Sequence, residues 1–302
     1  MRRKAFGRDR GLSARMALTT FLLGLLYVVF FLVLWRALNL GLGPVIVLVG
    51  ILAFVQWFTS DKVALMAARA RVVTAEEEPE LHAMVERLCA MGDLPKPRIA
   101  IAPTHVPNAF ATGRTPRHSA VAVTQGLLDR LEPQEVEGVI AHELAHIAHR
   151  DVTIMTLASF FSMVAGMLVR FGIYSNMGSR NRDSNGAPVW LIVIVVSIVT
   201  YVLSYILIMA ISRYREFAAD RGAALVTGAP EQLMSALQKI AGEMGRIPQK
   251  DLREAASLNA FFIIPTNWKQ SAGELFLTHP PLQKRLARLA EIANEMGKAA
   301  PV

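Results

Sequence analysis

The chain has 302 residues, of which 53% are apolar, and its mean hydropathy is +0.37. Ordinary soluble domains are less apolar, so the composition favours a membrane protein. The formal net charge of +8 is compatible with nucleic-acid binding, but the basic residues are not interleaved with aromatic ones as in nucleic-acid-binding modules. We therefore expect the lipid bilayer, with its anionic headgroups, and no nucleic acid as a partner.

Four apolar runs have about the length that a helix needs to cross a bilayer core, roughly 20 residues. They are Ala17–Trp35, Gly43–Phe58, Val152–Tyr174 and Pro188–Ile211. The second run is short, and Arg170 interrupts the third near its end, where a long side chain can reach the interface. The sequence therefore predicts about four transmembrane helices, and the alternative is that some of these runs are buried helices of a soluble protein.

A basic cluster precedes the first run, which is too long for the apolar part of a secretory signal. The cluster contains Arg2, Arg3, Lys4, Arg8, Arg10 and Arg15. Positive charge favours the cytoplasmic side, and four spans return the chain to that side, so we expect both termini in the cytoplasm. The predicted segments are 1–58 (basic N-terminus and two spans), 59–151 (first cytoplasmic part), 152–211 (a transmembrane hairpin) and 212–302 (second cytoplasmic part). The lone Cys89 fits a reducing compartment.

The first cytoplasmic part is predicted to be α+β. The stretch EEEPELHAMVERLCAMGDL has apolar residues at helical spacing behind an acidic first turn. The stretches PKPRIAIAP, NAFATGR and HSAVAVTQGLL contain small and β-branched residues between Pro and Gly, which is typical of a short sheet. Pro133 then stands at a first helical position with Glu135 in the first turn, so the stretch HELAH lies on a helix.

The second cytoplasmic part is predicted to be helical. Three stretches have helical patterns: SRYREFAADRGAALVTGAP up to its Gly and Pro, EQLMSALQKIAGEMG, and THPPLQKRLARLAEIANEMG after its proline pair. The two cytoplasmic parts together would form an α+β domain that a transmembrane hairpin divides in the sequence.

The stretch HELAH carries the most specific chemical signal. His142 and His146 are four residues apart, so on a helix both imidazoles project from one face and can bind one metal ion. Glu143 lies beside the first histidine, where its carboxylate can act as a general base on a metal-activated water. Two imidazoles and one carboxylate are a common ligand set for catalytic zinc, so we expect one Zn²⁺ per chain.

The third ligand has to come from another segment. Glu216 in SRYREFAAD is the best candidate, and Asp220 lies four residues on, where it could accept the free ring N–H of a ligand histidine. The alternative is that both acids pair with Arg213, Arg215 or Arg221 on a solvated helix. His149 lies three residues beyond His146 but points away from the ligand face, so we do not expect it to bind metal.

These residues belong to four motifs that together resemble a known family. The stretches PNAFATGR, VIAHELAHIAHRD, SRYREFAADRGAALVTG and THPPLQKRLARL, in this order, are similar to the HtpX-type membrane metallopeptidases, which are related to the CAAX prenyl endopeptidases. The resemblance extends from about Ala75 to Leu289 and includes the four-span layout. It implies an α+β zincin-like (gluzincin) catalytic domain, with a small sheet and an HExxH helix, combined with about four transmembrane helices.

The resemblance also implies a role for each site residue. His142, His146 and Glu216 would be the zinc ligands, Glu143 the catalytic glutamate and Asp220 the partner of a ligand histidine. The asparagine and histidine that face the substrate in the family match Asn108 and His279. His279 could donate to the developing oxyanion, and its alternative role is to cap the proline-led helix.

A function in protein quality control follows from the same resemblance. The strand of residues 108–113 would be an edge to which an extended peptide adds, which gives affinity with little sequence preference. The implied activity is zinc-dependent endoproteolysis of misfolded or damaged membrane proteins under stress, in the bacterial plasma membrane, with the site in the cytoplasm. One alternative is a prenyl-protein (CAAX) endopeptidase, although that class has more spans. Another is a non-catalytic membrane scaffold stapled by zinc, against which the presence of Glu143 argues.

Overall fold

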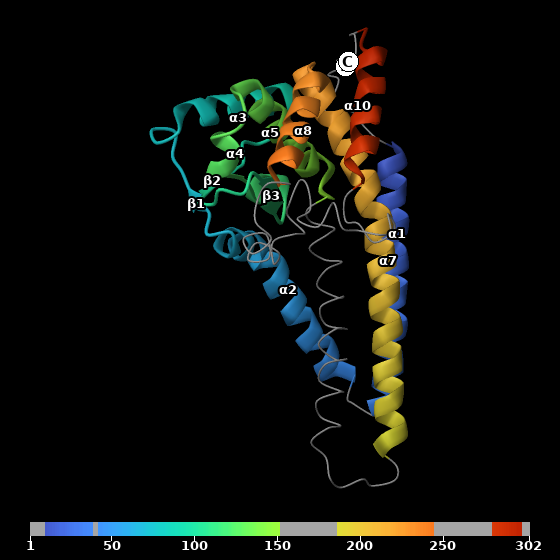
Figure 1. The fold of residues 1–302 in the computed structure, drawn as a ribbon. Coiled ribbons are helices and arrows are strands. Elements are labelled where there is room, and N and C mark those ends of the chain that lie inside the picture. Colours follow the sequence, from blue (N-terminus) through green and yellow to red (C-terminus); the bar gives the residue numbers. More distant parts are fainter. Residues whose placement is uncertain (1–9, 39–41, 152–185, 245–279, 298–302) are drawn as a thin grey trace. The chain divides into compact units, whose positions relative to one another are not determined.

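The computed structural model describes residues 10–38, 42–151, 186–244 and 280–297. The chain forms two compact units, each assembled from segments that are distant in sequence (Figure 1). The first unit takes Met1–Leu12, Thr59–Thr153 and Ser212–Val302, and the second takes Ser13–Phe58 and Ile154–Ile211. The described helices and strands of the first unit carry the candidate site.

The first unit contains a small mixed sheet with helices packed against it. Its strands are β1 (Arg71–Val72), β2 (Arg98–Ala102), β3 (Ala109–Gly113) and β4 (Ser119–Thr124). Its helices are α3 (Pro79–Gly92), η1 (Pro116–His118), α4 (Gln125–Leu128), α5 (Pro133–His149), α8 (Pro230–Met244) and α10 (Leu282–Glu295). The predicted sheet and helices in this part of the chain are confirmed, whereas the two-residue β1 was not expected.

The sheet order is β1-β2-β4-β3, which makes β3 an outer strand of the described sheet. β2 pairs with β4 in parallel, and β3 pairs with β4 antiparallel with Phe110 opposite Ala122. Gly113 ends β3 with φ of +141°, and a Cβ there would lie 2.5 Å from the carbonyl oxygen of His118. Only glycine allows β3 and β4 to turn so tightly.

Side chains alternate between the two faces of this sheet, as the period of a strand requires. One face packs with α3, α5 and α8 in the main core. Its strand residues are Ile99, Ala109, Ala111, Val121 and Val123. The opposite face packs against the end of α2 (Leu42–Ala67). Its strand residues are Ala100, Ala102, Phe110, Ala120 and Ala122, and they contact Ala64, Leu65 and Ala68. The small alanine side chains allow the helix to approach the sheet closely.

Helix α5 begins and ends at well-defined signals. Glu132 and Glu135 form a capping box, in which each side chain accepts from the other residue's backbone N–H, and Pro133 occupies the first turn. The helix ends at Arg150, whose left-handed backbone (φ 61°) turns the chain back toward the last turn. Twelve residues of α5 are buried, among them His142, Glu143 and His146.

The second unit contains α1 (Arg10–Leu38) together with the first parts of α2 and α7 (Gly186–Thr227). By length and composition, two helices of the described chain could cross a membrane, with qualifying stretches Gly11–Val33 and Leu191–Thr227. The first, second and fourth predicted runs are helical, while the third lies outside the described residues. Each of the three helices is longer than its run, and α7 continues 16 residues past Ile211 without a break.

α1 and α7 are joined inside the second unit by apolar contacts and a hydrogen bond. Leu23 and Tyr27 pack against Ile208 and Met209. The Tyr27 hydroxyl donates to Ser204 Oγ at 2.7 Å, and both side chains are buried. A hydroxyl pair of this kind satisfies polar atoms that would otherwise face apolar surroundings.

Candidate metal centre

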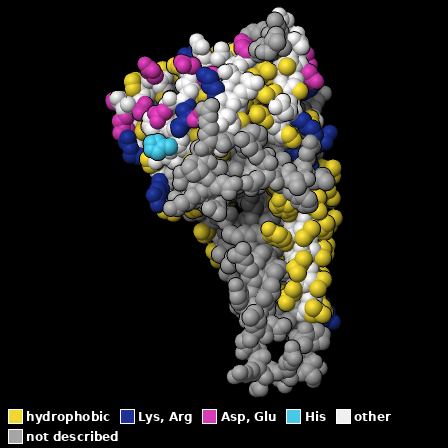
Figure 2. Space-filling model, viewed as in Figure 1, with side chains coloured by type: hydrophobic (Ala, Val, Ile, Leu, Met, Phe, Trp, Pro, Cys, Tyr) yellow, Lys and Arg dark blue, Asp and Glu magenta, His cyan; other side chains and the backbone are white. Residues whose placement is uncertain are grey.

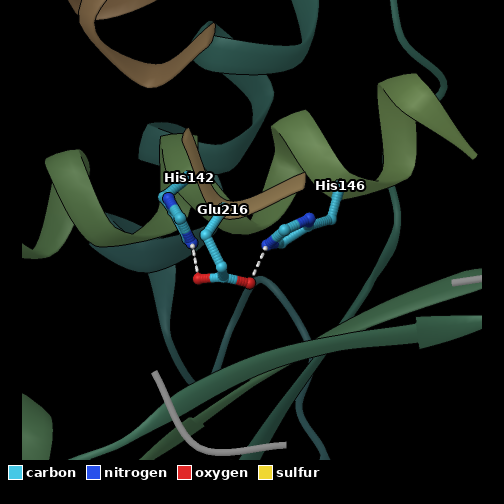
Figure 3. Close-up of side chains that lie close together, drawn as sticks. All are labelled: His142, His146 and Glu216. Atoms are coloured by element: carbon cyan, nitrogen blue, oxygen red, sulfur yellow. Dashed lines mark ion pairs between the residues drawn. The ribbon is translucent and has the colours of Figure 1, made fainter. Parts of the chain in front are cut away.

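Three buried side chains converge between α5 and α7 within the first unit. His142 and His146 lie on one face of α5, and Glu216 reaches them from α7 (Figure 3). His142 Nε2 is 3.6 Å from Glu216 Oε2, and His146 Nε2 is 3.5 Å from Glu216 Oε1. The ligand atoms of all three lie within 4.8 Å of one another, so they can share one metal ion. The structure therefore brings together the predicted third ligand and the histidine pair.

Glu143 stands next to this cluster and is 5% exposed. Burial raises the pKa of its carboxyl, while the charge of His142 and His146 and a hydrogen bond with the Ala111 backbone oppose this rise. The raised pKa makes the carboxylate a better proton acceptor than a solvent-exposed glutamate. The contact with Ala111 also places Glu143 beside the outer strand β3.

Asp220 lies behind His142, on the side away from Glu216. Its Oδ1 is 2.9 Å from His142 Nδ1, so the other ring nitrogen, Nε2, is the one that faces Glu216. Burial alone would lower the pKa of His142, but the neighbouring carboxylates of Asp220 and Glu216 raise it to about 9. The nearby carboxylates thus favour positive charge at this place, and a bound cation would supply such a charge.

Arg285 of α10 completes this side of the cluster. Its Nε donates to Asp220 Oδ2 at 2.9 Å and its Nη2 donates to Asp220 Oδ1 at 2.6 Å. Its Nη1 is 3.6 Å from Glu216 Oε2. The side chain of Arg285 is 2% exposed, so this guanidinium is buried against the two α7 carboxylates.

Asp151 lies behind His146 as Asp220 lies behind His142. His146 Nδ1 is 2.9 Å from Asp151 Oδ2, and Arg215 Nε is 3.3 Å from the same oxygen. Burial alone would raise the pKa of Asp151, but Arg215 and His146 outweigh burial and hold the pKa below its usual value. Asp151 reaches His146 because the left-handed Arg150 reverses the chain at the end of α5.

The remaining predicted residues have different outcomes. Asn108 is buried immediately before β3, and its backbone N–H and carbonyl both bond with Thr124. His149 does not belong to the metal cluster of the described residues, as expected. His279 lies outside the described residues. The alternative for the α7 acids fails for two arginines, since Arg215 pairs with Asp151 and Arg221 with Glu295.

Sequence reasoning missed Asp151 and Arg285. Asp151 stands five residues after His146, just past the helix end, and a search for carboxylates near the motif would have found it. Arg285 is 65 residues from Asp220, and nothing in their spacing connects them. Only the packing of α10 against α8 brings this guanidinium to the cluster.

The charges of the cluster suit a divalent cation. Four carboxylates and two guanidiniums leave a charge of −2 when both imidazoles are neutral. The acids are Glu143, Asp151, Glu216 and Asp220, and the bases are Arg215 and Arg285. Two imidazoles and one carboxylate are a ligand set that zinc commonly takes. The residues present therefore fit the metal that the motif implies.

Comparison with known proteins agrees with this geometry. The profile of peptidase family M48 matches residues 75–293. A protease HtpX homolog of Moorella thermoacetica is 52% identical over 297 residues, which cover 97% of this chain and 98% of that protein. Protease HtpX homolog 1 of Streptomyces coelicolor is 50% identical over 295 residues and 97% of each chain.

One solved structure shares the fold. The crystal structure of Ste24p from S. mikatae superposes with a TM-score of 0.55 at 16% identity and covers 93% of this chain and 67% of that one. At this identity the likeness concerns the fold alone. The family profile, the full-length identity to HtpX homologs and the His-His-Glu cluster all agree, and the chain accordingly belongs to peptidase family M48 as a membrane metallopeptidase of the HtpX type.

Proposed function

We propose that this metallopeptidase uses one zinc ion, held by His142, His146 and Glu216, to cleave polypeptides of misfolded or damaged membrane proteins. The observation that supports this most is the convergence of three buried donors within 4.8 Å beside a buried carboxylate. When bound, zinc supplies the Lewis acidity that makes water a nucleophile near neutral pH and polarises the peptide carbonyl.

Glu143 carries out the proton transfers. Its carboxylate takes a proton from the attacking water and delivers it to the nitrogen of the leaving amine, so that the bond between carbonyl carbon and nitrogen breaks. Asp220 and Asp151 hold Nδ1 of His142 and His146, which leaves each Nε2 directed at the metal position. His279, by the family resemblance, donates to the carbonyl oxygen as it becomes an oxyanion.

The substrate would bind along β3 as an extended peptide. β3 is the outer strand of the described sheet, and the Ala111 backbone bonds with Glu143. A peptide paired with β3 would present one of its carbonyls near the Glu143 carboxylate, and Asn108 would contact the peptide where β3 begins. Main-chain pairing accepts many sequences, which suits a protease of damaged proteins.

We also propose where the site lies relative to the membrane. Glu216 follows Ile211, the end of the apolar run, by five residues of continuous helix, which is about 7.5 Å along α7. The basic N-terminus favours the cytoplasmic side. We therefore place the site in the cytoplasm near the headgroups of the plasma membrane, with a multi-pass topology and both termini on the same side.

Replacing Glu143 tests the mechanism. We expect Glu143→Gln, in the full chain purified in detergent, to keep one zinc per chain and to cleave an unfolded protein about 10²- to 10⁴-fold more slowly. The measurements are zinc content by atomic absorption and product formation by gel. Glu137→Gln is the matched control, since Glu137 is on the same helix and pairs with Arg87. Cleavage by Glu143→Gln at the wild-type rate would disprove the proton-transfer role.

The same assay distinguishes the two alternative functions. A prenyl-protein endopeptidase would cleave a prenylated C-terminal peptide faster than an unfolded membrane protein, whereas we expect the opposite preference. A zinc-stapled scaffold would contain zinc and cleave neither substrate, in the wild type as in Glu143→Gln.

A further inference from the structure

Behind each histidine of the cluster lies an aspartate, and behind each aspartate lies an arginine. Each Nδ1 lies 2.9 Å from an aspartate oxygen, and each of these aspartates is fully buried. Behind the aspartates are two arginines, Arg285 for Asp220 and Arg215 for Asp151. The three members of the His142 group come from α5, α7 and α10. Those of the His146 group come from α5, the residue that follows Arg150, and α7.

Burial explains why the arginines are needed. A buried carboxylate is costly unless its oxygens are paired, and a single imidazole N–H can occupy only one of the two oxygens. Arg285 contacts both oxygens of Asp220, so this carboxylate has a fixed plane. The fixed carboxylate in turn keeps its Oδ1 2.9 Å from His142 Nδ1, and this close contact restrains the orientation of the His142 ring.

Arg285 also contacts the third member of the cluster. Its Nη1 is 3.6 Å from Glu216 Oε2, the oxygen nearest to His142 Nε2. One guanidinium is thus within reach of Glu216 and of the aspartate behind a histidine. Arg215 has a single contact of 3.3 Å with Asp151 and is the weaker of the two supports.

Backbone strain beside Asp151 also supports a positioning role for the group of His146, Asp151 and Arg215. Arg150 is left-handed with φ of 61°, a conformation that is unfavourable for a residue with a Cβ. This conformation is what turns Asp151 back toward His146. The strained turn is maintained although glycine would adopt it without strain, and the buried contacts of Asp151 with His146 and Arg215 hold it in place.

We propose that Arg285 and Arg215 are positioning residues of the metal centre, which hold Asp220 and Asp151 and, for Arg285, also Glu216 in the arrangement that binds the metal. This inference rests on the zinc site of the proposed function. Neither arginine contacts the substrate. Loss of either one frees an aspartate to rotate, and the histidine or glutamate that it supports then loses its orientation toward the ion.

Zinc release measures this role without catalysis. The full chain carrying Glu143→Gln, which prevents self-cleavage, is loaded with zinc in detergent and challenged with a chromogenic chelator. We expect Arg285→Lys to weaken zinc binding by about 10- to 100-fold, because an ammonium cannot make the two parallel bonds to Asp220. The effect of Arg215→Lys should be smaller. Arg288→Lys and Arg221→Lys are matched controls, since both arginines are exposed and lie on the same helices as Arg285 and Arg215.

A second readout separates positioning from a general structural role. If Arg285 positions the ligands, the rise in melting temperature that zinc produces will shrink in Arg285→Lys, and the visible spectrum of the cobalt-substituted protein will change. Equal losses of melting temperature with and without zinc, together with unchanged zinc release, would overturn the inference. Absence of zinc from the Glu143→Gln parent would instead overturn the proposed function, so the two failures can be told apart.

Discussion

The two halves of α7 differ in the side chains that they expose and in the polar groups that they bury. From Leu191 to Ile211 the exposed side chains are almost all large and apolar, and Figure 2 shows hydrophobic side chains gathered along this helix. The buried residues of this half include the neutral hydroxyls Ser197, Thr200 and Ser204. From Ser212 to Thr227 the buried residues are mainly alanines and charged groups, and the exposed ones are Arg221 and Leu225.

This contrast shows how one helix serves two surroundings. Apolar groups on the outside and hydroxyls on the inside are what lipid favours, because hydrocarbon offers no partner for a polar atom. Charges appear only in the second half, where Arg215 and Arg285 neutralise buried carboxylates. The metal centre thus begins where the pattern typical of lipid contact ends.

Replacing Glu216, the proposed metal ligand in the second half of α7, should have the largest effect. We expect Glu216→Ala to lose most of its zinc and to reduce cleavage to background, because two imidazoles alone hold the ion weakly. Arg221→Ala, on the exposed side of the same half, is the control and should keep both zinc and activity. Full zinc content in Glu216→Ala would show that Glu216 is not a ligand.

One substitution placed in each half tests which surface faces lipid. Val199 is 49% exposed and Leu225 is 38% exposed. We expect Val199→Lys to disfavour membrane insertion by about 2.5 to 3.5 kcal/mol, which is the penalty for lysine near the centre of a span. Leu225→Lys should change stability by about 0.5 kcal/mol or less, as is usual at a water-exposed position.

The measurement is the fraction of chain that resists carbonate extraction from membranes. Equal losses for the two lysine variants would contradict the boundary that the burial pattern indicates. A loss confined to Leu225→Lys would place the lipid contact on the other half of α7.

Removing the hydrogen bond between Tyr27 and Ser204, in the first half of α7, should have the smallest effect. We expect the coupling between Tyr27→Phe and Ser204→Ala to be about 0.6 kcal/mol, the average for hydrogen bonds inside membrane proteins. A double-mutant cycle, with unfolding followed in mixed detergent micelles, measures it. A coupling above about 2 kcal/mol would exceed the range known for such bonds, and would mean that this hydroxyl pair supports more than one contact.

Local spacing accounts for the parts of the site that sequence predicted well. His142 and His146 had to share a helix face because they are four residues apart, and Pro133 and Glu135 marked where this helix begins. Glu216 and Asp220 have the same spacing on α7, and the structure places Glu216 against both histidines and Asp220 against His142. Alternating small and β-branched residues likewise predicted β2, β3 and β4.

Contacts between distant segments account for what sequence could not predict. Arg285 and Asp220 are 65 residues apart, and no repeat or period relates them. Pairing of Arg215 with the acids of its own helix was only the alternative to a metal site. A helix places adjacent residues about 100° apart, and Arg215 reaches Asp151 on another segment. The continuity of α7 past Ile211 was also unpredicted, because an apolar run shows where a span is and not where its helix ends.

The amino-acid sequence alone determined the chemistry of this protein: an HExxH pair with its glutamate, a distant acid motif, and apolar runs for a membrane. These features follow from composition and helical periodicity, which are local properties of the chain. Only the tertiary structure decided that Asp151 lies behind His146 and which guanidiniums hold Asp151 and Asp220. Such pairings depend on buried charges finding partners across helices, and the partner is chosen by packing geometry rather than by distance along the chain.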